Sequence, residues 1–169
     1  MKMLQPQPPG FDMHSFKFDF TIRESRQDVW NWLNTPETFT ETQIPPFRVE
    51  FYSPSEDIPN GFHEGVLNTH HGPMINFSGV LTKVESPSYR DLQYYYGSYA
   101  VSIRWIRPYR LQFWLAESGE DTIVTAQIDS YVKPWIRGLW TKAQKLFWSR
   151  FPSWARKSVA KLRKKSFRH

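Results

Sequence analysis

The chain has 169 residues, and its 22 Lys and Arg against 16 Asp and Glu give it a formal net charge of +6. This length supports one domain with a substantial core and leaves too little chain for two ordinary domains. The absence of cysteine excludes disulfides, thiolate nucleophiles and cysteine-ligated metals, while the 8 Trp, 8 Tyr and 13 Phe favour an apolar cavity or a lipid surface.

Residues 1–14 are rich in Pro and Gln, and we predict a flexible lead-in there. They contain no continuous apolar run of the kind found in secretory signals. No segment of the sequence reaches the roughly 20 uncharged apolar residues that are needed to cross a bilayer. We therefore expect a cytoplasmic protein, with peripheral contact at the inner face of a membrane as a further option.

A strand and two short helices are predicted next. Every second residue from Phe16 to Ile22 is apolar, which is the period of a strand with one buried face. Ser25, with an acid three residues later, has the position of a helix N-cap. Thr35 followed by Pro36 predicts the end of this helix and the start of a second one.

Strand signals recur at close spacing between Phe47 and Val132, where short apolar runs alternate with turn residues. The turn signals are Asn60-Gly61, Gly72-Pro73, Ser86-Pro87-Ser88 and Ser118-Gly119-Glu120-Asp121. Pro108 lies within one of the strand runs and predicts a bulge or an interruption there. We expect about six antiparallel strands joined by short turns, which form a twisted sheet with a concave face.

From Pro134 the sequence predicts a long helix that is broken or kinked near Pro152. At about 100° per residue, one arc of this helix collects six apolar residues, and we predict that this stripe is buried against the sheet. Its members are Ile136, Leu139, Trp140, Ala143, Leu146 and Phe147.

The order of these elements resembles the START-like helix-grip superfamily, which includes SRPBCC proteins of the polyketide cyclase/dehydrase and lipid transport type. The resemblance covers roughly residues 15–150, and it rests on two segments: FKFDFTIRESRQDVWNWLNTPETF at 16–39 and LQFWLAESGEDTIVTAQIDSYVKPW at 111–135. It implies an α+β fold in which a curved antiparallel sheet of about seven strands wraps around a long C-terminal helix, with two short helices after the first strand.

Three parts of the chain follow from this resemblance. Residues 1–14 form the lead-in, 15–151 the ligand-binding domain, and 152–169 a basic amphipathic extension. The superfamily has a ligand cavity between the sheet and the long helix. We predict that this cavity binds, or carries, a hydrophobic small molecule such as a lipid or a polyketide-like aromatic.

Aromatic side chains could hold the apolar body of such a ligand, and an arginine could hold a carboxylate or enolate. The candidate ligand-binding residues are Glu64, Tyr94, Tyr96, Arg104, Phe113, Leu139, Trp140, Ala143 and Phe147. No cofactor is predicted. One alternative is a cyclase- or dehydratase-type enzyme acting in the same cavity. Another is a binding module that its basic tail recruits to a membrane or to nucleic acid.

The sequence leaves the choice between binding and catalysis open. It contains no nucleophile elbow, no phosphate-cradling glycine loop and no dinucleotide fingerprint. Acid–base catalysis would depend on Glu64, His70, a Tyr or an Arg. His63, Glu64, His70 and His71 are also metal-ligand types, but adjacent strand residues point to opposite faces, and six strand residues span about 20 Å. We therefore predict no metal site.

Positive charge gathers at the end of the chain. The segment from Lys133 to Arg168 holds 12 of the 22 basic residues, and no acid follows Asp129, so this segment carries +12 and the rest carries 10 − 16 = −6. A basic helix with a Trp on its apolar side suits an anionic membrane, while nucleic acid or plain solvent would also accept such a tail. The residues predicted to contact a membrane or polyanion are Trp154, Arg156, Lys157, Lys161, Arg163, Lys164 and Lys165.

Overall fold

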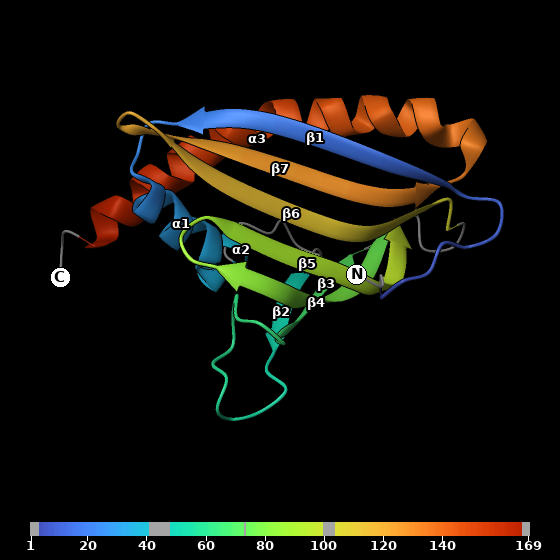
Figure 1. Cartoon of the computed structure of the whole chain (residues 1–169), viewed down its shortest axis with the longest axis horizontal. Coiled ribbons are helices and arrows are strands. Elements are labelled where there is room, and N and C mark those ends of the chain that lie inside the picture. Colours follow the sequence, from blue (N-terminus) through green and yellow to red (C-terminus); the bar gives the residue numbers. More distant parts are fainter. Residues whose placement is uncertain (1–3, 41–47, 73, 100–103, 167–169) are drawn as a thin grey trace.

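The computed structural model describes residues 4–40, 48–72, 74–99 and 104–166, with their side chains except those of 39–40, 96, 98–99 and 162–166. The elements are β1 (Asp12–Ile22), α1 (Arg26–Asn34), α2 (Pro36–Thr40), β2 (Arg48–Tyr52), β3 (Leu67–Gly72), β4 (Ile75–Glu85), β5 (Tyr89–Tyr99), β6 (Ile106–Ser118), β7 (Asp121–Val132), η1 (Pro134–Ile136) and α3 (Arg137–Ser166). Figure 1 shows one curved sheet with α3 behind it. The predicted α+β helix-grip fold is confirmed.

The sheet joins the first strand to the last. Its order is β1-β7-β6-β5-β4-β3-β2, and every neighbouring pair is antiparallel. β1 pairs with β7 from Asp12 opposite Val132 to Ile22 opposite Thr122. The β6–β7 register shifts at Pro108, so the bulge predicted from this proline is confirmed.

The two short helices begin where the sequence predicts. The Oγ of Ser25 accepts a hydrogen bond from the backbone N of Asp28 at 3.2 Å and so caps α1. α2 begins at Pro36. The buried side of α1, which includes Trp32 and Leu33, packs on one face of the sheet together with α3, and we call this the concave face.

The main core lies between α1, the second half of α3 and strands β1, β6 and β7. Its buried members are Phe20, Ile22, Val29, Trp30, Trp32, Leu33, Phe113, Leu115, Val124, Ala126, Trp148, Ala155 and Val159. A second core, around Phe62, Phe77, Leu92 and Tyr94, joins β4 and β5 to the loop before β3. The concave face is therefore covered by helices over one part of the sheet and by a loop over the other.

The predicted buried stripe of the long helix is wrong for most of its members. Leu139, Leu146 and Phe147 are 65%, 57% and 58% exposed, and Ala143 is exposed too. The buried residues follow one another at intervals of three or four instead: Ile136, Trp140, Gln144, Trp148, Pro152, Ala155 and Val159. The prediction failed because the true stripe includes the polar Gln144, whose Oε1 accepts a hydrogen bond from Trp148 Nε1 at 2.9 Å, so that apolar content alone selected another arc.

Helix α3 runs through Pro152 and contributes to the core on both sides of it. In Figure 1 its final part slants toward α1. Trp32 Nε1 donates to Ser158 Oγ at 2.9 Å, and the rings of Trp32 and Trp154 lie 5.5 Å apart. The residues after Pro152 that were expected to form an extension are thus part of the packed domain as far as Val159.

The described part of the N-terminal lead-in packs on the convex face of the sheet. Gln5 Nε2 donates to the carbonyl of Pro108 at 3.0 Å, and Tyr131 Oη donates to the carbonyl of Gln5 at 2.9 Å. Phe11 is buried against Tyr109 and Tyr131. Residues 5–11 are therefore bound rather than free. No helix in the described part of the chain is long and apolar enough to cross a membrane.

Candidate functional site

Three aromatic rings meet on the concave face of β3, β4 and β5, and we call them the ring cluster. His70 lies opposite Phe77 in the β3–β4 register, and their rings stack with centroids 4.6 Å apart. Tyr94 of β5 meets Phe77 edge-on at 5.0 Å and His70 at 6.2 Å. Alternation along the strands places all three on one face, because every second residue of a strand points the same way.

The ring cluster contains a neutral imidazole. Burial, and then the charge of neighbouring His71, lower the pKa of His70 to about 4. Such a ring is uncharged near pH 7 and presents one nitrogen as donor and the other as acceptor. Asn68, two residues earlier on the same face, is buried, and its Oδ1 has no hydrogen-bond partner among the described residues. Polar groups able to orient a ligand therefore lie beside apolar rings.

A buried arginine ties helix α1 to the same face. Arg90 Nη1 donates to the carbonyl of Leu33 at 2.6 Å and to Asn34 Oδ1 at 3.1 Å. Its guanidinium carbon lies 4.0 Å from the ring centroid of Phe62 and 5.2 Å from that of Phe113. Burial lowers the pKa of Arg90 to about 9, so the group is still charged at pH 7. The C-terminal end of a helix attracts such a cation, and the contact fixes α1 against the sheet.

The structure places two of the predicted ligand-binding residues on the concave face, in the two different cores. Tyr94 belongs to the ring cluster, and Phe113 lies between Arg90 and Trp148, whose ring centroid is 6.4 Å away. Tyr96 pairs with Ser78 through its backbone, and its side chain lies outside the described residues.

The other predicted ligand-binding residues lie elsewhere. Glu64 is exposed in the loop before β3, and its Oε1 accepts a hydrogen bond from the backbone N of Val84 at 2.8 Å. Trp140 is buried against Ile106, Val132 and Ile136. Leu139, Ala143 and Phe147 are exposed on α3, as described above. These three helix residues are exposed because the buried stripe of α3 has a different register from the predicted one.

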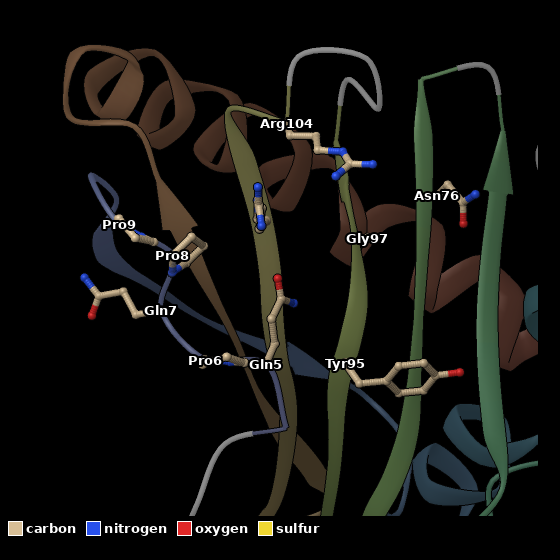
Figure 2. A pocket seen from close by; sticks show the side chains of 10 residues that line it. Gln5, Pro6, Gln7, Pro8, Pro9, Asn76, Tyr95, Gly97 and Arg104 are labelled. Carbon is tan, nitrogen blue, oxygen red and sulfur yellow. The ribbon is translucent and has the colours of Figure 1, made fainter.

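Arg104 lines a pocket of about 340 Å³ on the convex face, away from the ring cluster (Figure 2). The other walls are Arg107, Tyr95 and Asn76 together with residues 5–9. Arg107 Nε is buried without a hydrogen-bond partner among the described residues. The prediction that Arg104 shares a site with Tyr94 is therefore wrong. This pocket was not predicted from the sequence, because the lead-in that forms part of its wall was expected to be flexible.

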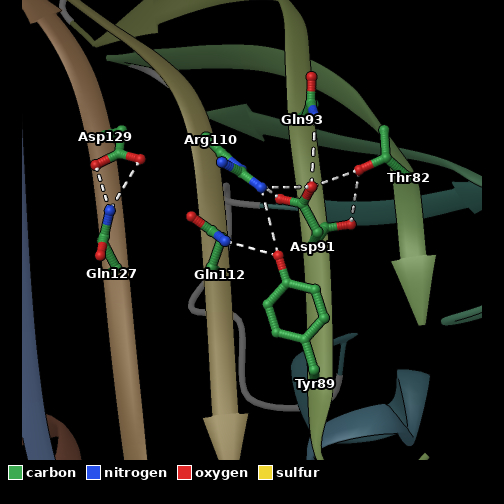
Figure 3. Close-up of polar contacts among 8 residues, drawn as sticks. All are labelled: Thr82, Tyr89, Asp91, Gln93, Arg110, Gln112, Gln127 and Asp129. Carbon is green, nitrogen blue, oxygen red and sulfur yellow. Dashed lines mark hydrogen bonds and ion pairs between the residues drawn. The ribbon is translucent and has the colours of Figure 1, made fainter. Parts of the chain in front are cut away.

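The convex face also carries a polar network that joins β4, β5 and β6, beside a separate Gln127–Asp129 pair on β7 (Figure 3). Arg110 Nε lies 2.8 Å from Asp91 Oδ1, and Asp91 Oδ2 accepts from Thr82 Oγ1 at 2.7 Å. Gln112 Nε2 donates to Tyr89 Oη at 2.6 Å. Hydrogen bonding to Asp91 raises the pKa of Arg110. Because these partners satisfy one another, the network holds the strands together.

A second pocket, of about 480 Å³, opens between the start of α2, strand β2 and Gly61. Phe51, one of its walls, packs edge-on against Phe62 with ring centroids 4.7 Å apart. Phe62 belongs to the same core as Phe77 and Tyr94. The pocket thus adjoins the core that contains part of the ring cluster, at the end of the sheet where the two short helices lie.

The histidines considered as metal ligands are spread over different positions. His71 Nε2 lies 3.4 Å from Glu50 Oε2, on the face opposite to His70, and His63 is exposed in the loop before β3. Within the part of the chain that the structure describes, no three metal-ligand side chains come together.

The residues predicted to contact a membrane or polyanion fall into two groups, those that pack on the domain and those that are exposed. Trp154 packs against Phe151 at 5.1 Å as well as Trp32, and Arg156 Nη1 donates to the carbonyl of Thr21 at 3.3 Å. Lys157 and Lys161 are exposed. The side chains of Arg163, Lys164 and Lys165 lie outside those described. Trp154 is therefore part of the domain's packing.

No family model matches the chain, and no curated protein matches it. Solved structures do match. One is norcoclaurine synthase from Thalictrum flavum in complex with dopamine and hydroxybenzaldehyde: 12% identity, TM-score 0.60, covering 92% of this chain and 89% of that one. Another is a protein of Mesorhizobium loti, with 12% identity, TM-score 0.64 and coverage of 88% and 98%. A third is Ara h 8.0201, with 12% identity, TM-score 0.59 and coverage of 88% and 95%. At these identities the likeness shows the helix-grip fold that the sequence segments predicted.

Proposed function

We propose that this chain binds a small aromatic or otherwise hydrophobic molecule on the concave face of its sheet, at the ring cluster. The observation that carries the proposal is the meeting of His70, Phe77 and Tyr94 beside the polar Asn68 Oδ1. Rings supply apolar contact area, and a few polar atoms fix the orientation of a ligand. A molecule with a flat apolar body and one hydroxyl or amine group fits this chemistry.

Two further observations support this location. The pocket beside Phe51 and Gly61 adjoins the same core and opens to solvent near the short helices. A structure of the same fold holds dopamine and hydroxybenzaldehyde, both small aromatic molecules with polar groups. Binding or carriage of a lipid uses the same apolar surface and is included in the proposal.

The proposal can be tested by native mass spectrometry of the purified chain, followed by titration with the apolar dye 1-anilinonaphthalene-8-sulfonate. Tyr94→Leu should weaken dye binding roughly tenfold, since it removes a ring from the proposed site. Tyr95→Leu is the matched control, because Tyr95 is 46% exposed and lines the convex pocket. Equal dye affinity for the parent and Tyr94→Leu, with both folded by thermal unfolding, would overturn the proposal.

A cyclase- or dehydratase-type reaction at the same cluster is the second candidate, and the observation that favours it is the neutral His70. Its uncharged imidazole has a nitrogen that can accept a proton from a ligand bound against Tyr94, and a pKa of about 4 makes it a weak base that requires an acidic ligand proton. If the chain is such an enzyme, His70→Phe should abolish conversion of the molecule found by mass spectrometry while retaining its binding. Unchanged conversion by His70→Phe would exclude His70 as the base.

A further inference from the structure

We propose that the outer face of the first half of α3 docks on an anionic membrane surface. Trp135 of η1 and Leu139, Leu146 and Phe147 of α3 are 65%, 65%, 57% and 58% exposed. Single exposed apolar residues are ordinary on protein surfaces, but four large ones within 13 positions of a single helical stretch form a patch. We call these four residues the outer patch.

The outer patch cannot turn inward, because the opposite side of the helix is fixed. Leu139 and Leu146 lie about 140° to 160° around the axis from the buried Gln144, at about 100° per residue. Trp140 is buried in the core below, and Thr141 Oγ1 lies 2.9 Å from His14 Nε2 of β1. These contacts hold Leu139 and Leu146 toward the outside of the molecule. Phe147 lies only about 60° from Gln144, at the edge of the outer patch, and its ring centroid is 5.2 Å from that of Trp148.

The charges around the outer patch identify its partner. Lys142 and Lys145 are exposed in this half of the helix, Arg150 is exposed just beyond it, and no acidic residue follows Asp129 in the sequence. An apolar strip flanked by cations matches the boundary between acyl chains and anionic headgroups. Further along α3, the exposed Lys157 and Lys161 extend the same positive field.

Other occupants fit less well. A second copy of the chain would bring its own cations against these, and like charges facing each other oppose association. A nucleic acid would use the lysines and arginines but would have no need of the aliphatic and aromatic side chains. The sequence predicted that Trp154 inserts into the membrane, but Trp154 packs against Trp32 in the domain. We therefore assign membrane insertion to the outer patch.

The test is co-sedimentation of the full chain with vesicles of phosphatidylcholine containing about 30% phosphatidylserine, against pure phosphatidylcholine vesicles. We expect binding to the anionic vesicles that falls as salt rises. The double variant Leu139→Ser, Leu146→Ser should lose roughly tenfold or more in vesicle affinity, since both side chains point outward and are 65% and 57% exposed. The matched control is Met13→Ser, Met74→Ser, since these residues are 58% and 64% exposed on strand β1 and just before β4. The control should bind as the parent does.

Three results would overturn the proposal. The first is unchanged vesicle affinity of the Leu139→Ser, Leu146→Ser variant. The second is a parent dimer, seen by light scattering, that this variant converts to a monomer, which would assign the patch to a second copy. The third is tighter binding to single-stranded RNA than to the vesicles, with no effect of the variant. Dye binding at the ring cluster should be unchanged in this variant, so failure here is distinguishable from failure of the proposed ligand site.

Discussion

The two halves of α3 carry opposite surfaces. The first half, from Arg137 to Phe147, buries Trp140 and Gln144 and exposes its large aliphatic residues. The second half buries Trp148, Ala155 and Val159 in the main core and exposes mainly charged residues. Contact with α1 explains the difference, since α1 packs against α3 through Trp32, whose partners Ser158 and Trp154 belong to the second half. Burial along this helix follows its neighbours more closely than its apolar content.

Truncation of the chain after Pro152 should cause the largest loss of folding stability, because it removes most of the second half of α3. It removes Ala155 and Val159, which are 0% and 2% exposed, together with Ser158. We expect the loss to exceed about 5 kcal/mol, which is comparable with the whole stability of a small domain. The truncated chain should therefore show no cooperative transition in thermal or urea unfolding.

Truncation after Lys161 is the control and should leave a cooperative transition, because the buried positions of α3 in the described residues end at Val159. The domain limits predicted from the sequence end the ligand-binding domain at residue 151. They therefore imply that the chain truncated after Pro152 still unfolds cooperatively. If the chain truncated after Pro152 unfolds like the parent, the second half of α3 does not contribute to the stability of the core.

A pair of aspartate substitutions tests the two halves directly. Ala155→Asp places a charge in the main core and should cost about 4 kcal/mol in the free energy of unfolding. Leu139→Asp places the same charge on the outer patch, where it meets solvent, and should cost less than about 1 kcal/mol. Urea midpoints measure both. Equal losses would show that the helix buries both faces.

Acid should weaken the molecule through two buried histidines. The pKa of His70 falls from 6.5 to about 4 on folding, and burial also lowers the pKa of His14, which contacts the first half of α3 through Thr141. As pH drops below 6.5, the unfolded chain binds protons that the native state does not. Stability is therefore full above pH 6.5 and is lost as pH falls toward 4.

We expect His70 to account for about 2 kcal/mol of this loss, less than its full shift implies, because its ring keeps some contact with solvent. Urea unfolding between pH 7 and 4 measures the slope, and His70→Phe should flatten it. In His14→Gln, the pH dependence of amide protection, measured by hydrogen exchange, should change in the first half of α3 and stay the same in the second half. A slope that survives both substitutions would contradict the assignment.

The smallest effect concerns two serines of α3. Ser158→Ala removes the acceptor of the Trp32 Nε1 hydrogen bond and should cost about 1 kcal/mol. Ser149→Ala removes a bond from its Oγ to the carbonyl of Leu146 on the exposed side, and should be within about 0.5 kcal/mol of the parent. Thermal unfolding can rank the pair, and the reverse order would contradict the contrast between buried and exposed sides.

The fold could be predicted because its signals are local. Alternation from Phe16 to Ile22, the Ser25 cap, Pro36 and the turn residues each depend on a few neighbours in sequence, and the structure has these elements at the expected places. Such signals fix the order of the elements, and the order pointed to the helix grip.

The candidate site could be predicted only in part because its geometry is not local. Tyr94 and Phe113 were predicted from their residue types, and the structure places both on the concave face. The partnership of His70 with Phe77 depends on strand register, and that of Arg90 with Leu33 on how α1 crosses the sheet. The stripe of α3 was misassigned because Gln144 is buried by its bond to Trp148, a pairing that apolar periodicity does not report. Arg104 was misplaced because it lies before the start of β6 with a positive φ of 52°, so the alternation of a strand does not apply to it.

The pairing of β1 with β7 also affects how the chain folds as it is synthesised. β1 finds its neighbour only in the last strand, Gln5 binds Tyr131 and Trp32 binds Ser158, each 126 positions later. A nascent chain on the ribosome therefore exposes the aromatic face of β1 and α1 until almost all of it has emerged. Contacts this distant in sequence give folding times of about milliseconds to seconds, so chaperones that shield aromatic segments should matter most before α3 leaves the exit tunnel.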